Sequence, residues 1–116
     1  MIIGIGLDIV EVERIANLSI RQERFSKRIL TVNELKSYER LSNRRKVEYL
    51  AGRFAAKEAY AKARGTGIGS HLSFLDIEIG TDENGKPWIV KPEFANPHVS
   101  ITHTHQYAAA QVVIEG

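Results

Sequence analysis

Two carboxylates stand in apolar segments of this 116-residue chain. Asp8 interrupts the apolar run "MIIGIGLDIV", and Glu58 falls in the alanine-rich segment "RFAAKEAYAKARGTGIG", residues 53–69. On a helix Glu58 lies about 40° from Phe54, in the middle of an apolar stripe. The other members of that stripe are Val47, Leu50, Ala51 and Ala61. An uncompensated buried carboxylate is costly, so Glu58 should be protonated, paired or bound to a cation.

The simpler interpretation of Glu58 is an ion pair with Lys62, one helical turn later, worth about 0.2–0.5 kcal/mol. Asp8 favours a second interpretation. It shares one face of the first strand with Gly4 and Gly6, whose missing side chains let another element approach closely. Two carboxylates brought together there would repel unless a hard divalent cation lay between them. Oxygen ligands in a chain without cysteine favour Mg²⁺, which takes its remaining ligands from water and phosphate.

A lysine and a glycine-rich segment follow Glu58 and favour an anionic ligand. Lys62 lies one turn before "GTGIGS", where it is well placed to meet a phosphate as a point charge. Backbone N–H groups around Gly65 and Gly67 could approach the same anion. The glycines are also explained if they only end the helix.

The first half of the chain predicts one strand followed by helices. Residues 2–9 read as a strand, and a polar helix should run from about Val12 to Phe25. Thr31 and Glu34 form a capping box that begins a short helix. Ser42 or Asn43 can cap the long helix that holds Glu58, and Gly65 can end it in a left-handed conformation. One face of the strand carries Ile3, Ile5, Leu7 and Ile9.

The second half is rich in predicted strands. Alternation over residues 72–80 predicts a strand, and Asn84-Gly85 a hairpin turn into "WIV". After a loop between Pro92 and Pro97, residues 98–104 and 108–115 read as strands around a tight turn at Gln106. The order of an N-terminal strand, three helices and then a mostly antiparallel sheet predicts an α+β fold. The length predicts a single compact domain over residues 1–116.

Composition narrows the class of protein. The chain has no cysteine, which excludes disulfides and thiolate metal sites. The apolar amino terminus lacks a basic n-region, and Asp8, Glu11 and Glu13 cut it short, so we interpret it as a strand and expect a cytoplasmic protein. The net charge is +2, with most basic residues between Arg14 and Arg64, which suggests an anionic partner.

Three motifs together resemble a known family. "GIGLDIVEVERI", "RFAAKEAYAKARGTGIG" and "VSITHTHQYAAA" are similar in order and spacing to the holo-acyl-carrier-protein synthases, the small bacterial 4′-phosphopantetheinyl transferases. The resemblance covers essentially the whole chain. It implies Mg²⁺-dependent transfer of 4′-phosphopantetheine from coenzyme A to a serine of apo-acyl-carrier protein, in fatty acid biosynthesis, with release of adenosine 3′,5′-bisphosphate. It also implies that Asp8 and Glu58 hold the metal and that Lys62 lies near the diphosphate.

The resemblance further implies a homotrimer with active sites between subunits. His103 or Thr104 would then contact the coenzyme across an interface, although alternation with Val99 and Ile101 also suits a core histidine. His105 receives no role. Arg64 departs from the aromatic or apolar residue usual in the family at that position. Candidates for binding the 3′-phosphate of coenzyme A are Arg44, Arg45 and Arg53, each of which could equally be a surface residue.

The predicted helix after the first strand offers a face for an acidic carrier protein. If helical, residues 14–28 bring together on one face Arg14, Leu18, Arg21, Phe25 and Arg28, with Arg24 beside them. The alternative is an amphipathic helix in which Leu18 and Phe25 enter the core while the arginines reach water.

Other functions explain less of the sequence. A small basic nucleic-acid-binding module would account for the arginines, but not for Asp8 and Glu58, and no aromatic stacking platform is evident. We therefore expect neither a nucleic-acid nor a membrane partner. A zinc site would have to be built from His98, His103 and His105 alone. Glu58, a metal-bound water or Asp8 could take the serine proton, and we prefer a water polarised by Glu58 and the metal.

Overall fold

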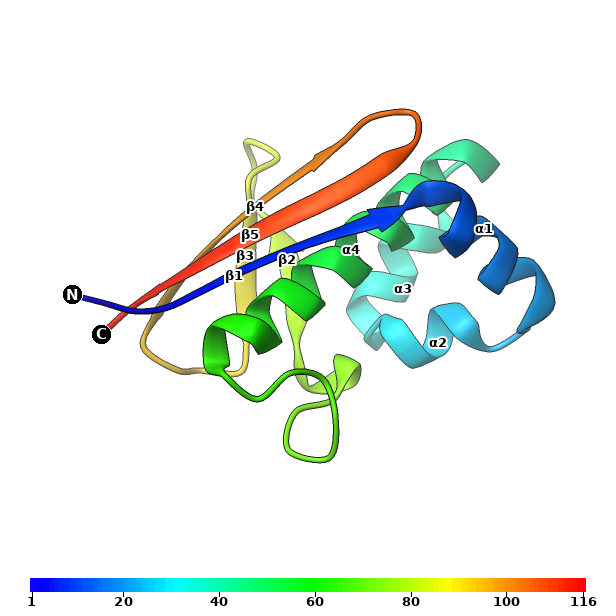
Figure 1. Cartoon of the computed structure of the whole chain (residues 1–116). Coiled ribbons are helices and arrows are strands. Elements are labelled where there is room, and N and C mark those ends of the chain that lie inside the picture. Colours follow the sequence, from blue (N-terminus) through cyan, green and yellow to red (C-terminus); the bar gives the residue numbers. More distant parts are fainter.

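The computed structural model, which describes residues 1–116, packs a long central helix against a three-stranded antiparallel sheet (Figure 1). The helix is α4 (Asn43–Arg64), and the sheet has the strand order β1-β5-β4. These strands are β1 (Ile2–Glu11), β5 (Tyr107–Glu115) and β4 (Asn96–His103). The predicted α+β class, with an N-terminal strand, helices and then antiparallel strands, is confirmed. No helix is both long and apolar enough to cross a membrane.

Three shorter helices and a 3₁₀ turn complete the helical part, which gathers at one end of the sheet (Figure 1). The predicted continuous helix over residues 14–28 is wrong, because α1 ends at Arg21 and a new helix begins at Phe25. Gln22 is extended, and the break lets Ile15 pack from α1 and Phe25 from α2, both buried. The elements are α1 (Val12–Arg21), α2 (Phe25–Ile29), α3 (Val32–Glu39) and η1 (Phe74–Asp76).

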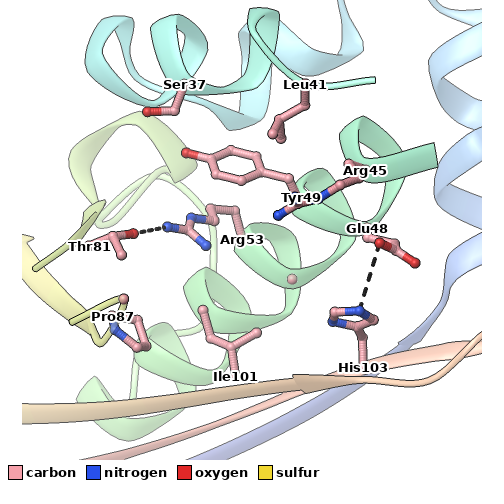
Figure 2. Close-up of a pocket in the computed structure, with 12 residues that line it drawn as sticks. Ser37, Leu41, Arg45, Glu48, Tyr49, Arg53, Thr81, Pro87, Ile101 and His103 are labelled. Atoms are coloured by element: carbon pink, nitrogen blue, oxygen red, sulfur yellow. Dashed lines mark hydrogen bonds and ion pairs between the residues drawn. The ribbon is translucent and has the colours of Figure 1, made fainter. Parts of the chain in front are cut away.

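A two-stranded hairpin, β2 (Glu78–Thr81) and β3 (Pro87–Lys91), lies beside α4. Gly85 adopts the positive φ that the predicted Asn84-Gly85 turn requires. The predicted strand over residues 72–80 starts too early, because the Ser73 N–H donates to the Asp76 carboxylate and caps the η1 turn. Thr81 of the hairpin points toward Arg53 of α4, and Pro87 lines the same cavity (Figure 2).

Close approach of β1 to α4 explains the glycines of the first motif. A Cβ atom at Gly6 would collide with the carbonyl oxygen of Ala59, and one at Gly4 with that of Ala63. The prediction that another element approaches the glycine face is therefore confirmed, and that element is the backbone of α4. The contact brings Asp8, two residues after Gly6, against the last turns of the helix.

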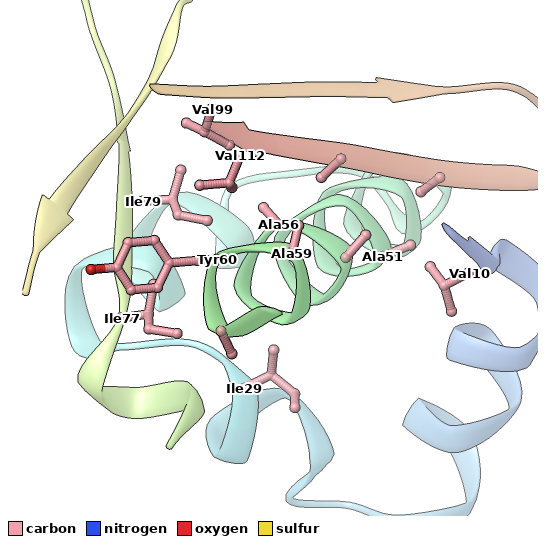
Figure 3. Packing of buried hydrophobic residues seen from close by; sticks show 14 of the residues in the cluster. Val10, Ile29, Ala51, Ala56, Ala59, Tyr60, Ile77, Ile79, Val99 and Val112 are labelled. Atoms are coloured by element: carbon pink, nitrogen blue, oxygen red, sulfur yellow. The ribbon is translucent and has the colours of Figure 1, made fainter. Parts of the chain in front are cut away.

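Helix α4 is buried on almost every side (Figure 3). Alanines along it pack under the sheet, where Val99 and Val112 point toward the helix. The predicted apolar stripe is in the core, with Leu50, Ala51 and Ala61 fully buried and Phe54 packed against it. The placing of Glu58 at the centre of a buried face is wrong, because Glu58 is only half-buried. The small alanine side chains let other elements pack against several sides of α4, so the helix is not buried on one face alone. Its fully buried residues include Leu50, Ala51, Ala55, Ala56, Ala59, Tyr60 and Ala61.

A buried ion pair fastens the helical elements to α4. Lys57 is completely buried, and its ammonium donates to the Glu34 carboxylate at 2.6 Å. It also donates to the carbonyl oxygens of Ile29 at 2.5 Å and Phe74 at 3.1 Å. The capping box of Thr31 and Glu34 is confirmed, and Glu34 additionally accepts from the Ile79 N–H. One lysine thus joins the ends of α2 and α3 and the η1 turn to the central helix.

The outer face of β1 carries a row of exposed apolar side chains. Ile3, Ile5, Leu7 and Ile9 have 52, 62, 63 and 65% of their surfaces exposed. They alternate with the residues that face α4, as predicted from the sequence. A row of this length on an edge strand is the kind of surface that proteins usually cover.

Candidate active site

Asp8, Glu58 and Lys62 meet where β1 crosses the last turns of α4. Lys62 Nζ donates to Asp8 Oδ1 at 3.0 Å and to the Leu7 carbonyl oxygen at 3.0 Å. The Lys62 side chain is half exposed, whereas that of Asp8 has 16% of its surface exposed. The predicted alternative, an ion pair between Glu58 and Lys62, does not form, because Lys62 reaches across to the strand instead.

The electrostatics of Glu58 reflect this crowding. Burial raises the pKa of the Glu58 carboxyl, and the negative charge of Asp8 raises it further. Lys62 and Arg14 act in the opposite direction and lower this pKa. Two carboxylates and two cations therefore influence one another, and the protonated form of Glu58 is favoured relative to a free glutamate.

A basic cavity of about 650 Å³ opens on the other flank of α4 (Figure 2). Arg45 and Arg53 contribute positive charge from the helix, and His103 faces them from β4. The wall is completed by α3 above, the β2–β3 hairpin at one side and β4 below. Uncharged lining residues include Ser37, Leu41, Tyr49, Gly52, Thr81, Pro87 and Ile101.

Arg53 is held in the cavity with hydrogen-bonding capacity to spare. Its guanidinium stacks over the Tyr49 ring, 4.3 Å from the centroid, and Nη2 donates to Thr81 Oγ1 at 3.0 Å. Its Nε is buried and has no hydrogen-bond partner. Buried donors are normally satisfied, so this atom is an exception in the fold.

Some of the residues predicted to bind coenzyme A line the basic cavity, namely Arg45, Arg53 and His103. Others lie outside it. Arg44 does not line the basic cavity, and its Nη2 donates to the carbonyl oxygen of His105 at 2.8 Å. Arg44 also pairs with Glu48, whose second oxygen lies 3.8 Å from His103 Nε2. The Thr104 hydroxyl accepts from the backbone of the turn that follows β4, and Thr104 is absent from the cavity wall.

The glycine-rich segment after α4 is exposed and open. Gly65 ends the helix with a φ of 82°, which confirms the predicted left-handed cap, and Gly67 has a φ of 65°. No atom lies within 4 Å of a Cβ built at either position. Arg64 turns away from this segment, with its guanidinium over the Phe94 ring at 3.8 Å. Lys62, in the last turn of α4 before this segment, has half of its side chain exposed.

The arginines predicted to bind a carrier protein are all exposed, on α1 and around α2. Phe25, however, is buried in the core, as the amphipathic alternative expected, and Leu18 packs partly against it. The large apolar side chain that α1 does expose is Ile20, at 82% of its surface. The exposed arginines are Arg14, Arg21, Arg24 and Arg28.

The carboxylate cluster and the basic cavity do not form one site within a single chain. Glu58 lies roughly 140–180° around α4 from Arg45, Tyr49 and Arg53. No group of three or more His, Cys, Asp or Glu is arranged to hold a metal, and this includes His98, His103 and His105. Each half has chemistry suited to an anionic substrate, but the halves face different directions.

Several residues of the site escaped the sequence analysis. Tyr49 and Glu48 line the cavity, and Lys57 forms a buried ion pair with Glu34 in the core. None of them was a candidate site residue. A signal for Lys57 was available, because a helical wheel puts it about 20° from Leu50 and about 40° from Ala61, on a buried face. Tyr49 stands four residues before Arg53, the spacing of a stacked pair on a helix. Thr81 and Pro87 come from a distant hairpin and gave no local signal.

The fold and the sequence together place the chain in a class of transferases. The family model of the 4′-phosphopantetheinyl transferase superfamily matches residues 4–113. The chain belongs to this superfamily.

Individual relatives narrow the class further. The chain is 65% identical to the holo-[acyl-carrier-protein] synthase of Bacillus subtilis strain 168, over 99% of this chain and 97% of the relative. It is 61% identical to the protein of the same name from Anoxybacillus flavithermus, over 99% of this chain and 97% of that relative. The resemblance to the holo-acyl-carrier-protein synthases predicted from three motifs is confirmed, and with it the prediction of an enzyme.

Solved structures agree with these relatives. The crystal structure of a holo-(acyl-carrier-protein) synthase from Bacillus anthracis, in complex with CoA (3′,5′-ADP), superimposes with a TM-score of 0.95 at 49% identity. It is matched over 98% of its length and 100% of this chain. The Helicobacter pylori enzyme in complex with coenzyme A gives a TM-score of 0.84 at 34% identity, over 96% of this chain and 99% of that one.

Proposed function

We propose that the protein transfers the 4′-phosphopantetheine arm of coenzyme A to a serine of apo-acyl-carrier protein, in fatty acid biosynthesis in the cytoplasm. In this reaction the serine oxygen bonds to the phosphorus that carries the arm. The P–O bond to the nucleotide breaks, and adenosine 3′,5′-bisphosphate leaves with the electron pair. The observation that carries the proposal is the cluster of Asp8, Glu58 and Lys62, found in a chain whose relatives include solved complexes with coenzyme A.

The residues of the cluster fit Mg²⁺. Glycines at positions 4 and 6 let β1 approach α4, and the charge of Asp8 reaches Glu58 strongly enough to raise its pKa. Two carboxylates are the protein contribution that Mg²⁺ usually takes, and phosphate oxygens and waters supply the rest. When bound, the metal would neutralise charge on the diphosphate and make the bisphosphate a better leaving group.

The chain's own groups would handle charge and the proton. Lys62, half exposed beside the open glycine segment, can approach a diphosphate oxygen and stabilise the negative charge that builds during transfer. Glu58 can accept the serine proton through an intervening water.

The basic cavity fits the adenosine 3′-phosphate end of coenzyme A. Arg45, Arg53 and His103 line the cavity and supply donors for a phosphate oxygen. Tyr49, already stacked on Arg53, provides an aromatic wall. The polar and apolar groups together suit a nucleotide.

A homotrimer with active sites between subunits would unite the two halves. Within one chain they face opposite flanks of α4, so a neighbouring subunit must bring its cavity toward this chain's carboxylates if both serve one substrate. The exposed row Ile3, Ile5, Leu7 and Ile9 offers an apolar surface for that contact.

The proposed function is tested by measuring the transfer of phosphopantetheine to the carrier protein. Purified protein is mixed with apo-acyl-carrier protein, coenzyme A and Mg²⁺, and the carrier is weighed by mass spectrometry. We expect its mass to increase by one phosphopantetheine, and the increase to disappear with chelator or with a carrier whose acceptor serine is replaced by alanine. An unchanged carrier mass in the complete mixture would contradict the proposed function.

A further inference from the structure

Lys62 already occupies part of the place where the proposed metal would bind. Its ammonium donates to Asp8 Oδ1 and to the Leu7 carbonyl oxygen, each at 3.0 Å. Asp8 has no other ion-pair partner. One oxygen of a carboxylate assigned to the metal is therefore engaged by a cation of the chain itself.

An ammonium and a divalent cation bound to the same carboxylate repel each other. Like charges about 4 Å apart repel appreciably even at the effective dielectric of a protein surface. The Lys62 side chain is half exposed, so it has solvent into which it can move, whereas Asp8 is held on a strand packed against α4. The mobile partner of the pair is therefore the lysine.

We infer that Lys62 competes with the divalent cation for Asp8, and that metal binding releases the Lys62 ammonium to the phosphates of the substrate. This inference rests on the proposed function, because the metal belongs to it. It gives Lys62 two opposite effects. The lysine weakens binding of metal to the free protein, and it accelerates transfer once metal and coenzyme A are both present.

The first experiment measures metal binding without turnover. Mn²⁺ is titrated into the wild-type protein and the Lys62→Met variant, and free Mn²⁺ is followed by electron paramagnetic resonance. We expect Lys62→Met to bind Mn²⁺ about two- to fivefold more tightly, the range that corresponds to loss of an exposed ion pair. The matched control is Lys36→Met, which removes an exposed lysine of α3 that makes no ion pair.

The outcomes of the titration separate the inference from the proposed function. Equal or weaker binding by Lys62→Met overturns the competition, as does equal tightening in Lys36→Met, which would indicate only a change in net charge. If the wild-type protein transfers the arm while Lys62→Met leaves Mn²⁺ affinity unchanged, the function stands and the inference fails. If Mn²⁺ binds neither protein, the metal site and the inference fail together, whatever the transfer assay gives.

A second experiment observes the released lysine. The wild-type protein is treated briefly with acetic anhydride, with and without saturating Mn²⁺, and acetylation of each lysine is measured by peptide mass spectrometry. We expect Mn²⁺ to increase the acetylation of Lys62 relative to Lys36, because an amine freed from a carboxylate is more accessible to the reagent. An unchanged or reduced ratio would show that Lys62 stays on Asp8 and would overturn the inference.

Discussion

Asp8 and Glu58 place two negative charges at the edge of α4, where burial alone would already disfavour one of them. Such an arrangement lowers the stability of the folded protein in exchange for a site that attracts a cation. The cost is visible in the Glu58 carboxyl, whose pKa is raised first by burial and then by Asp8. The loss of folding stability caused by the two carboxylates should therefore depend on pH and on bound metal.

We predict that Glu58→Gln abolishes most of the transferase activity and raises the melting temperature in the absence of metal at pH 7.5. The folded state holds the Glu58 proton more tightly than the unfolded state, so ionisation of Glu58 destabilises the fold as pH rises above the ordinary glutamate pKa of 4.5. The gain in melting temperature should shrink toward zero near pH 4. Near-normal activity and Mg²⁺ dependence in Glu58→Gln would disprove its role as a metal ligand.

A second prediction concerns the arginines of the basic cavity. Removing one donor to a bound phosphate should raise the KM for coenzyme A about ten- to hundredfold, the cost of a lost charge-assisted hydrogen bond. We expect this from Arg45→Ala and from Arg53→Ala, with little effect from Arg40→Ala, which alters an exposed residue after α3. With 3′-dephospho-coenzyme A the cavity variants should behave like wild type. Equal effects on both substrates would remove the arginine from the 3′-phosphate site.

At the scale of elements, α4 holds both halves of the site, and Lys57 ties three other elements to it. Its ammonium is buried with Glu34 and two backbone carbonyl groups, although burial itself lowers the pKa of the lysine. Breaking one partner of a buried pair leaves the other charge uncompensated, which costs more than the pair contributes.

We predict that Lys57→Met lowers the free energy of unfolding by about 3–5 kcal/mol, measured by urea denaturation. The double variant Lys57→Met with Glu34→Gln should recover part of this loss, because no charge is left unpaired. Lys36→Met on the surface of α3 is the control and should change stability by less than about 0.5 kcal/mol. A loss under 1 kcal/mol for Lys57→Met would mean that water reaches the pair.

Features of these elements could be predicted where neighbouring residues in the sequence determine them. The capping box at Thr31, the turn at Gly85 and the left-handed Gly65 are set by neighbouring residues, and each was predicted correctly. The pairing of Lys57 with Glu34 joins residues 23 positions apart and depends on tertiary packing. The helix break after Arg21 likewise depends on how α1 and α2 pack on α4, and no local sequence pattern indicates this packing.

At the scale of the whole molecule, two observations support the proposed homotrimer. One is the exposed apolar row of β1, and the other is the separation of the carboxylate cluster from the basic cavity. A sequence can indicate that Ile3, Ile5, Leu7 and Ile9 share a face, but alternation does not tell whether a sheet buries that face itself. The fold shows that α4 covers the glycine side instead. In the proposed homotrimer the apolar side would contact a neighbouring chain.

We predict that Leu7→Glu dissociates the oligomer and reduces activity by at least about a hundredfold while each chain remains folded. A charge placed in an apolar interface is left without a partner, whereas in the free chain Leu7 is exposed and tolerates it. Light scattering gives the mass, and circular dichroism gives the fold. A monomeric wild-type protein, or an active monomeric variant, would contradict a site shared between subunits.

The last prediction concerns the surface that receives the carrier protein. Arg14 and Arg21 of α1 and Arg24 before α2 are exposed, and α1 also exposes Ile20, about 100° around the helix from Arg21. Arg14 is a poor choice for a test, because its charge also lowers the pKa of Glu58. Arg21→Glu avoids this complication. It should raise the KM for an acidic carrier several-fold and leave the KM for coenzyme A nearly unchanged, since rim charges mainly affect encounter.

Salt and an apolar variant distinguish docking by charge from a general disturbance of the fold. Wild-type activity at limiting carrier should fall as salt increases, and Arg21→Glu should be less sensitive because one favourable charge is gone. Ile20→Ala should also raise the carrier KM, but with the salt dependence of wild type, since it removes contact area and no charge. Lys36→Glu on α3 makes the same charge reversal away from this surface and should have little effect. If Arg21→Glu changed both Michaelis constants equally, or if salt had no effect, α1 would not be the docking surface.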